Sequence, residues 1–362
     1  MTHKPHWLVL ATEAYGGRGG IAQYNRDFLS ALAASDQTSS IAVLVRAAPD
    51  PAEPQVGIRQ LAPRPRKWAY ALEALTSAMS RPVDVVFCGH LHMAVLAAAI
   101  ARVKNAKLVI QLHGIEAWQC PSRLQRAALE SADLVLAVSR HTRSRVLTWS
   151  AVAPERVLVL PNTVAEAFIP GDGSALRAEL RLERRRVLLT VGRLDARERY
   201  KGHDRIIAAI PALVAQGHDV AYVIIGEGED RARLGALARE AGIAERVLFL
   251  GAVSPDRLAA CYRMADLYVM PSTGEGFGIA FLEAMASGTP ALGLDVAGAR
   301  DALGEGELGT LVAEDELVAS IARLLAEPRR EPSALSESIR RRFGRDAFRA
   351  RLGNALDRMA SA

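Results

Sequence analysis

Short apolar runs alternate with helical stretches along almost the whole chain, and this alternation limits the fold more than any other feature. Apolar strands that are separated by amphipathic helices are typical of parallel sheets with right-handed crossovers. The strands predicted in the first half are Trp7–Thr12, Ile41–Val45, Val83–Phe87, Lys107–Leu112, Asp133–Val138 and Val157–Leu160. Those predicted in the second half are Arg186–Val191, Ala221–Ile225, Val247–Leu250, Leu267–Met270, Pro290–Leu294 and Leu308–Val312. We therefore expect an α/β protein with two doubly wound, Rossmann-like domains that bind ligand in a central cleft, at the carboxyl ends of their strands.

A cluster of turn-forming residues from Pro161 to Gly173 separates the two series of strands. The chain has 362 residues, which suits two domains at about 150 residues each. The predicted domains are residues 1–165 and residues 166–344. The stretch 332–362 is rich in Arg and amphipathic, so it is predicted to be helical and to dock through its apolar face.

The segment Met270–Pro290 has the strongest signs of a binding site. Glycines 274, 276 and 278 follow a predicted strand, and apolar residues at helical spacing begin at Ile279. A helix that starts behind a glycine loop offers free N–H groups to an anion. Glu275 and Glu283 add two carboxylates, which accept hydrogen bonds from sugar and ribose hydroxyls. The segment therefore suits a nucleotide-sugar.

Two cations follow the first predicted strand of the second domain. Arg193 comes directly after that strand, and Lys201 precedes the next predicted helix, so both can reach one diphosphate. The turns Gly226–Gly228 and Gly251–Val253 follow the next two strands and leave bare backbone for a base or a ribose.

The first domain leaves an alternative open. Gly17–Ala22 spells G-x-G-x-x-A after a strand, which is typical of dinucleotide sites, and Arg46 could bind the phosphate of NADP. An NADP-dependent oxidoreductase is therefore the first alternative, and a non-catalytic nucleotide- or sugar-binding protein is the second. His113 follows another strand and is expected on the floor of the cleft. His90, His92 and Cys88 lack the spacing of a four-ligand zinc site, and no D-x-D pair ends a strand, so we expect no metal.

Charge is unevenly distributed between the two halves. Residues 1–165 carry 18 Lys and Arg against 11 Asp and Glu, whereas residues 166–362 carry 27 against 29. Aromatic residues make up only 5% of the chain and do not interleave with a basic run, so we expect no nucleic-acid partner. A basic, amphipathic predicted helix around Arg64, Arg66, Lys67 and Trp68 suits an anionic membrane surface. Three scattered cysteines, no long apolar run and no leader-like N-terminus indicate a cytoplasmic protein.

With these motifs the chain resembles the retaining glycosyltransferases of family 4, which have the GT-B fold. The resemblance covers nearly the whole chain. Its most specific part is the G-E-G-F-G-I-A-F-L-E-A-M-A-S-G-T-P motif from Gly274 to Pro290. The supporting motifs, in chain order, are Gly19-Gly20, His113-Gly114, Pro161-Asn162-Thr163, Gly192-Arg193, Tyr200-Lys201-Gly202 and Gly226-x-Gly228. The spacing from Arg193 to Lys201 is longer than in many relatives, which puts the reach of Lys201 in question.

The resemblance implies a role for each matched residue. It makes Glu275, His113, Arg193 and Lys201 the catalytic group. It assigns the donor diphosphate to Arg193, Lys201, Gly19, Gly20, Gly278 and Ile279, and the donor sugar to Glu275, Gly276, Phe277 and Gly278. It assigns the ribose and base to Glu283, Gly226, Gly228 and Val253. Acceptor or membrane contacts are expected at Tyr24, Arg64, Arg66, Lys67 and Trp68.

The function expected from the resemblance is retaining transfer of a sugar from a nucleoside-diphosphate-sugar, without a metal or other cofactor. The first domain, joined by the helix at about 345–362, would bind the acceptor, and the second would bind the donor. The acceptor would be a glycolipid, a polyprenyl-diphosphate-linked sugar or a polysaccharide of the bacterial surface. The enzyme would act in the cytoplasm, peripherally on the inner face of the cell membrane.

Overall fold

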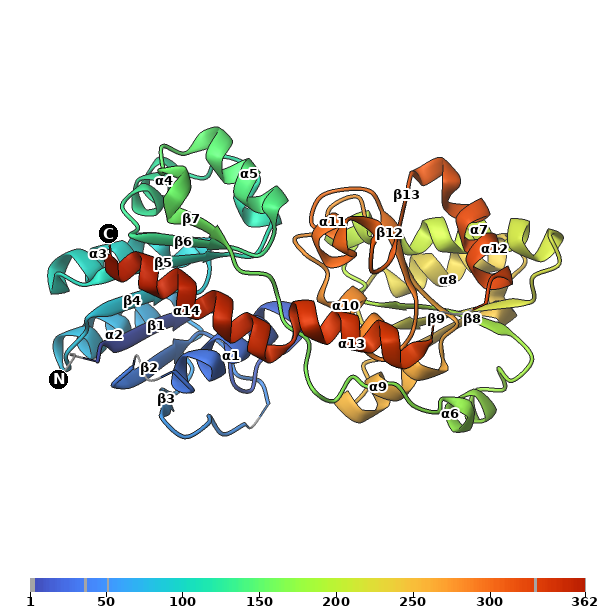
Figure 1. Cartoon of the computed structure of the whole chain (residues 1–362), viewed down its shortest axis with the longest axis horizontal. Coiled ribbons are helices and arrows are strands. Elements are labelled where there is room, and N and C mark those ends of the chain that lie inside the picture. Colours follow the sequence, from blue (N-terminus) through green and yellow to red (C-terminus); the bar gives the residue numbers. More distant parts are fainter. Residues whose placement is uncertain (1–3, 36–37, 51, 329–330, 362) are drawn as a thin grey trace. The chain divides into compact units, whose positions relative to one another are not determined.

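The computed structural model describes residues 4–35, 38–50, 52–328 and 331–361. The chain divides into two compact units (Figure 1). The first consists of residues 1–163 and 345–362, and the second of residues 164–344.

The first unit is built on a parallel sheet whose strand order is β3-β2-β1-β4-β5-β6-β7. The strands are β1 (His6–Ala11), β2 (Ser40–Val45), β3 (Ile58–Gln60), β4 (Val85–Cys88), β5 (Lys107–Leu112), β6 (Leu134–Ala137) and β7 (Val157–Val159). Its helices are α1 (Gly19–Ala33), α2 (Lys67–Met79), α3 (Ala94–Lys104), α4 (Arg123–Glu130), α5 (Arg140–Trp149) and α14 (Arg345–Ser361), with short 3₁₀ turns η1 (Leu91–Met93), η2 (Ile115–Ala117) and η3 (Pro154–Arg156). The central strands are almost entirely buried, which explains their unbroken apolar runs.

The second unit repeats this design with the strand order β10-β9-β8-β11-β12-β13. The strands are β8 (Arg186–Val191), β9 (Val220–Ile225), β10 (Val247–Gly251), β11 (Leu267–Met270), β12 (Ala291–Leu294) and β13 (Thr310–Val312). Its helices are α6 (Ser174–Glu179), α7 (His203–Ala215), α8 (Arg231–Glu240), α9 (Pro255–Met264), α10 (Ile279–Ala286), α11 (Ala299–Ala302), α12 (Leu317–Ala326) and α13 (Pro332–Phe343). The 3₁₀ turns are η4 (Ala196–Lys201), η5 (Ala244–Arg246), η6 (Gly304–Gly306) and η7 (Glu314–Glu316).

The C-terminal stretch 332–361 forms two helices, and the second, α14, lies where the resemblance placed a C-terminal helix. Gly344 ends α13, and a Cβ at this position would lie 2.3 Å from the carbonyl oxygen of Arg340. Helix α13 packs against α10 in the second unit, where the Ser336 hydroxyl donates to the carbonyl of Ala286 at 2.6 Å. Helix α14 packs against α1 in the first unit.

Each sheet has one topological switch point, between β1 and β4 in the first and between β8 and β11 in the second. On either side of such a point the chain leaves the strands in opposite directions, so the loops at their carboxyl ends diverge and open a crevice. This topology directs attention to the loops that follow β1, β4, β8 and β11.

Candidate functional site

The switch point of the second sheet brings together three residues that the sequence predicted. Strands β8 and β11 are hydrogen-bonded neighbours, with Leu188 opposite Leu267. The loop after β8 contains Arg193 and Lys201, and the loop after β11 contains Glu275. These charged side chains therefore extend from adjacent strand ends of one sheet.

The 3₁₀ turn η4 resolves the long spacing between the two cations. It folds residues 196–201 back, so that Arg193 and Lys201 contact the same carboxylate, that of Glu198. Nη2 of Arg193 pairs with Oε1, and Nζ of Lys201 lies 2.7 Å from Oε2. The Lys201 side chain is 14% exposed and lies over Gly192, where a Cβ would come within 3.3 Å of Nζ. Arg193 is 73% exposed, so its guanidinium is open to solvent.

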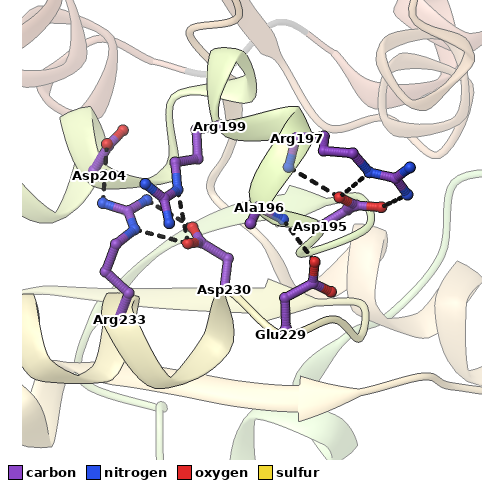
Figure 2. A network of polar contacts seen from close by, with 8 residues as sticks. All are labelled: Asp195, Ala196, Arg197, Arg199, Asp204, Glu229, Asp230 and Arg233. Carbon is purple, nitrogen blue, oxygen red and sulfur yellow. Dashed lines mark hydrogen bonds and ion pairs between the residues drawn. The ribbon is translucent and has the colours of Figure 1, made fainter.

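A network of ion pairs fixes η4 on the sheet (Figure 2). The buried carboxylate of Asp230 accepts hydrogen bonds from Nε of Arg199 at 3.0 Å and from Nε and Nη2 of Arg233 at 2.8 and 2.6 Å. The first residues of η4 are held by Asp195, whose side chain accepts from the backbone N–H of Arg197 at 2.9 Å. The donated hydrogen bonds of Arg233 hold the pKa of Asp230 below its usual range. The turn that carries Lys201 is therefore anchored to the N-terminus of α8.

The loop after β11 is held from two sides. The backbone N–H of Thr273 donates to the carbonyl of Tyr200 at 2.9 Å, which ties this loop to the end of η4. The N–H of Gly298 donates to the carbonyl of Glu275 at 2.9 Å, and a Cβ on Gly298 would lie 2.1 Å from the carbonyl oxygen of Gly276. Only glycine permits this approach, so Gly298 sets the position of the glutamate loop.

Glu275 carries a perturbed carboxyl group. Burial raises its pKa to about 7, against the opposing charge of Lys201, and Glu198 adds to the rise. Its Oε2 is buried and accepts no hydrogen bond from the described part of the chain. A buried acceptor without a donor is costly, and a ligand hydroxyl would satisfy it.

The other residues that the resemblance assigns to the donor follow strands of the second sheet. Gly278 has a φ of 92° and begins α10 without a side-chain cap, so the first N–H groups of the helix, including that of Ile279, lack a side-chain acceptor. The main chain of Phe277 belongs to this loop, while its ring is buried against Phe343. Glu283 follows in the second turn, where it accepts a hydrogen bond from the hydroxyl of Tyr262 at 2.7 Å.

Gly226, Gly228 and Val253 follow β9 and β10. The N–H of Gly226 donates to the carbonyl of Gly251 at 2.9 Å, which joins the two turns. Cβ atoms on Gly226 and Gly228 would lie 1.9 and 2.1 Å from the carbonyl oxygens of Gly192 and Leu194. These glycines allow the β8 loop to approach, and contact with a ribose or base stays a prediction.

In the first unit, Gly19 and Gly20 form the start of α1. Gly19 has a φ of 84°, and no side chain caps the helix, so its first N–H groups lack a side-chain acceptor. Arg18 pairs with Asp50 at 2.6 Å, and Arg46 donates to the carbonyl of Pro65 at 2.7 Å. The Arg46 side chain, which was considered as a partner for the phosphate of NADP, is thus already hydrogen-bonded within the protein.

His113 lies after β5 with a defined tautomer. Its Nε2 lies 2.9 Å from the carbonyl oxygen of Gly89, which can only accept, so Nε2 carries the proton and Nδ1 is an acceptor. Burial lowers the pKa of His113, although the Glu116 carboxylate opposes this, so the ring is neutral at pH 7. His113 is placed to accept a hydrogen bond through Nδ1.

Tyr24 is not a surface residue, and the prediction of an acceptor or membrane contact is wrong. The side chain is 1% exposed, and its hydroxyl donates to Oε1 of Gln111 at 2.6 Å. Its ring packs edge-on against the rings of His113 and Phe348, with centroids 5.1 and 5.9 Å apart. Tyr24 links helix α14 to His113 inside the first unit.

The predicted basic residues lie at the start of α2. Arg64, Arg66, Lys67 and Trp68 are all exposed, and Arg64 pairs with Glu73 at 3.1 Å. None of the helices in the described part of the chain has the length and hydrophobicity to cross a bilayer. Among those same residues, no group of three or more His, Cys, Asp or Glu side chains could hold a metal ion.

Sequence comparison assigns both units. A sequence model described as Glycosyltransferase Family 4 matches residues 18–168, and one described as Glycosyl transferases group 1 matches residues 174–342. A GDP-mannose-dependent alpha-(1-6)-phosphatidylinositol monomannoside mannosyltransferase of Mycolicibacterium smegmatis is 33% identical over an alignment of 267 positions, which covers 68% of this chain and 69% of that protein. The chain belongs to glycosyltransferase family 4. The family assignment decides against the oxidoreductase alternative.

Other proteins resemble this family 4 glycosyltransferase at lower coverage or identity. A D-inositol 3-phosphate glycosyltransferase of Rhodococcus opacus is 34% identical over an alignment of 228 positions, which covers 60% of this chain and 50% of that protein. Anabaena Alr3699/HepE, solved with UDP-glucose, has a TM-score of 0.79 at 20% identity over 98% of this chain and 99% of its own. Sucrose-phosphate synthase from Thermosynechococcus elongatus has a TM-score of 0.79 at 23% identity over 98% and 99%. These similarities confirm the GT-B fold.

Three contacts of this family 4 site were not predicted from the sequence: those made by Glu198, Tyr262 and Gly298. The composition does contain a signal for Lys201. Residues 166–362 contain 26 arginines but only this one lysine, so the choice of lysine at this position stands out. Its ammonium lies close to Gly192, and a compact ammonium and a planar guanidinium are not interchangeable in such a place.

Proposed function

We propose that this glycosyltransferase moves a sugar from a nucleoside-diphosphate donor to a lipid-linked or polysaccharide acceptor, with retention of the anomeric configuration. The observation that carries the proposal is the pair of cations, Arg193 and Lys201, on one carboxylate at the switch point of the second sheet. The uncapped start of α10 follows the neighbouring strand. Fixed positive charge at this place suits a diphosphate, and the donor complexes of HepE with UDP and with UDP-glucose support it.

The geometry suits stabilisation of a departing diphosphate. Negative charge builds on the leaving group as the bond to the sugar breaks, and Arg193, Lys201 and the α10 N-terminus supply positive charge without a metal ion or other cofactor. In the proposed mechanism the acceptor attacks from the face that the diphosphate leaves, and a diphosphate oxygen takes the acceptor proton. No protein nucleophile is needed.

The other residues hold the substrates in this proposal. Oε2 of Glu275 accepts a hydroxyl of the donor sugar, with the main chain of residues 276–278 beside it, and Glu283 accepts the ribose hydroxyls. Gly226, Gly228 and Val253 border the base. In the first unit, Nδ1 of His113 accepts a sugar or acceptor hydroxyl, and the amides of Gly19 and Gly20 bind phosphate oxygens.

A panel of nucleoside diphosphates tests donor binding. We expect UDP or GDP to raise the melting temperature, because a ligand that binds only the folded state stabilises it by about 2.7 kcal/mol at 100 times its Kd. Differential scanning fluorimetry with UDP, GDP, ADP and NADP⁺ measures this directly. Stabilisation by NADP⁺ alone, or by none of the four, would contradict the proposal. Hydrolysis or transfer of the matching nucleotide-sugar then separates an enzyme from a non-catalytic binding protein.

The acceptor is proposed to be a surface glycan precursor at the inner face of the cell membrane. The relatives include a phosphatidylinositol monomannoside mannosyltransferase, and a solved protein of the same fold is WaaG, a glycosyltransferase of lipopolysaccharide biosynthesis. The basic first unit and the surface of α2 suit a peripheral, cytoplasmic enzyme that binds anionic headgroups.

Helix α2 presents an apolar stripe beside these basic residues. Trp68 is 66% and Met79 is 67% exposed, and Leu72 and Leu75 lie exposed between them at helical spacing. Four large apolar side chains on one exposed stripe are unusual for a surface that meets only water. With Arg66 and Lys67 at its start, the helix has the charge and apolar pattern of an interfacial helix.

Replacing Trp68 and Leu72 by Ser is expected to reduce binding to anionic vesicles by about tenfold or more, because about 2 kcal/mol or more of apolar burial is lost. Co-sedimentation with phosphatidylglycerol-containing vesicles measures the binding. The double variant Arg66→Gln, Lys67→Gln should weaken the part of the binding that depends on salt concentration. Ile169→Ser, at an exposed apolar residue of the second unit, is the control. Equal sedimentation of all variants would reject the α2 surface.

A further inference from the structure

Glu198 occupies an unexpected position, between the two cations proposed to bind the donor diphosphate. One carboxylate oxygen pairs with Arg193, and the other lies 2.7 Å from Nζ of Lys201. The Glu198 side chain is only 12% exposed. Its two oxygens thus engage the same pair of cations that two phosphate oxygens would engage.

The backbone that carries Glu198 is held in place. Figure 2 shows Arg199 and Arg233 converging on Asp230, and Asp195 holding the first residues of η4. At the other end of η4, the carbonyl of Tyr200 accepts from Thr273. Since both ends of the turn are fixed, the carboxylate of Glu198 stays close to the cations and can leave them only by rotation of its own side chain.

The charges in this site oppose an incoming diphosphate. Arg193 and Lys201 carry two positive charges, and Glu198 and Glu275 place two carboxyl groups in the same field. A diphosphate that binds the cations must displace Glu198 or lie beside its negative charge. Like charges in a poorly solvated site repel strongly, so the carboxylate lowers the affinity for every diphosphate.

We propose that Glu198 is an internal competitor of the diphosphate: it neutralises Arg193 and Lys201 when the site is empty and speeds release of the nucleoside diphosphate after transfer. The proposal rests on the proposed function, because it takes a diphosphate to bind these two cations. It also explains why two cations are tolerated beside a glycine loop, since each has a carboxylate partner before the donor arrives.

Glu198→Gln tests the competition. The amide keeps the shape of the side chain and one acceptor oxygen but removes the charge. We expect the variant to bind the nucleoside diphosphate about tenfold more tightly, with most of the change in a slower koff. Isothermal titration with UDP and GDP gives Kd, and stopped-flow displacement of a fluorescent analogue gives koff. Thermal melting without ligand verifies that the variant is folded.

Glu240→Gln is the matched control, because it removes the same charge from an exposed residue at the C-terminal end of α8. It should leave Kd and koff unchanged. Unchanged or weaker binding by folded Glu198→Gln would overturn the competition and make Glu198 a residue that only positions Lys201. Failure of the wild-type protein to bind any nucleoside diphosphate would instead remove the proposed function, and this inference with it.

Discussion

Lys201→Met is expected to lower kcat/KM for sugar transfer by about 100-fold or more. The loss follows because a fixed charge that faces developing negative charge acts most strongly in the transition state, and one such group typically contributes a factor of 10² to 10³. Methionine keeps the length and apolar stem of the side chain, so the change removes little except the charge. Steady-state kinetics with the nucleotide-sugar identified by the thermal panel measures it.

Two further variants locate the effect at this position. Lys107→Met is the matched control, since Lys107 begins β5 and pairs on the surface with Asp133 at 3.0 Å. It should retain activity. Lys201→Arg restores the charge but not the fit beside Gly192, and it should stay well below wild type. Wild-type kcat/KM in folded Lys201→Met would show that the diphosphate is held elsewhere.

The fold could be predicted because the buried strands are continuous apolar runs. All twelve predicted strands are present, but β3 (Ile58–Gln60) was missed, since only one of its three residues is buried. The apolar pattern alone predicted one helical stretch over residues 332–362, whereas the resemblance placed a separate C-terminal helix at about 345–362, and the structure begins α14 at Arg345. At Gly344 the backbone leaves the helical region, with φ −70° and ψ 169°, and glycine is a weak helix former.

The site could be predicted as far as chain topology determines it. Arg193 and Glu275 follow strands that the doubly wound order makes neighbours, so their place at adjacent strand ends needs no side-chain detail. Glu198 was overlooked because its contacts depend on the path of η4, and a charged stretch between two cations looks like solvated loop. Such ion pairs are decided by backbone geometry that the sequence alone does not specify.

Tyr24 shows the opposite error. It was expected to contact the acceptor or the membrane, and that expectation left the helical period of α1 out of account. The buried residues Phe28 and Leu32 repeat from Tyr24 at intervals of four, so the helical period already placed it on the core face of α1. Period is the safer guide here, because it reports which face of a helix is covered.

Glu275→Gln is expected to abolish transfer and to stabilise the protein at alkaline pH. Its carboxyl group has a pKa of about 7 in the folded protein, raised by burial from 4.5. A raised carboxyl pKa means that the folded state binds the proton more tightly than the unfolded state. This contribution to stability is complete below pH 4.5 and is lost as the pH rises to about 7.

The lost stability is at most about 3 kcal/mol, from 1.36 kcal/mol per pKa unit. Glutamine is neutral at every pH, so the variant should melt several degrees above wild type at pH 8 and near wild type at pH 4.5. Melting curves of both proteins across this range measure the gap, with Glu240→Gln as the exposed control. Transfer needs the carboxylate, so the wild-type kcat/KM should fall as the pH drops below about 7. An equal or lower melting temperature for the variant at pH 8 would show that the charge of Glu275 does not destabilise the fold. Loss of transfer together with a gain of stability would show that Glu275 is kept for function at a cost in stability.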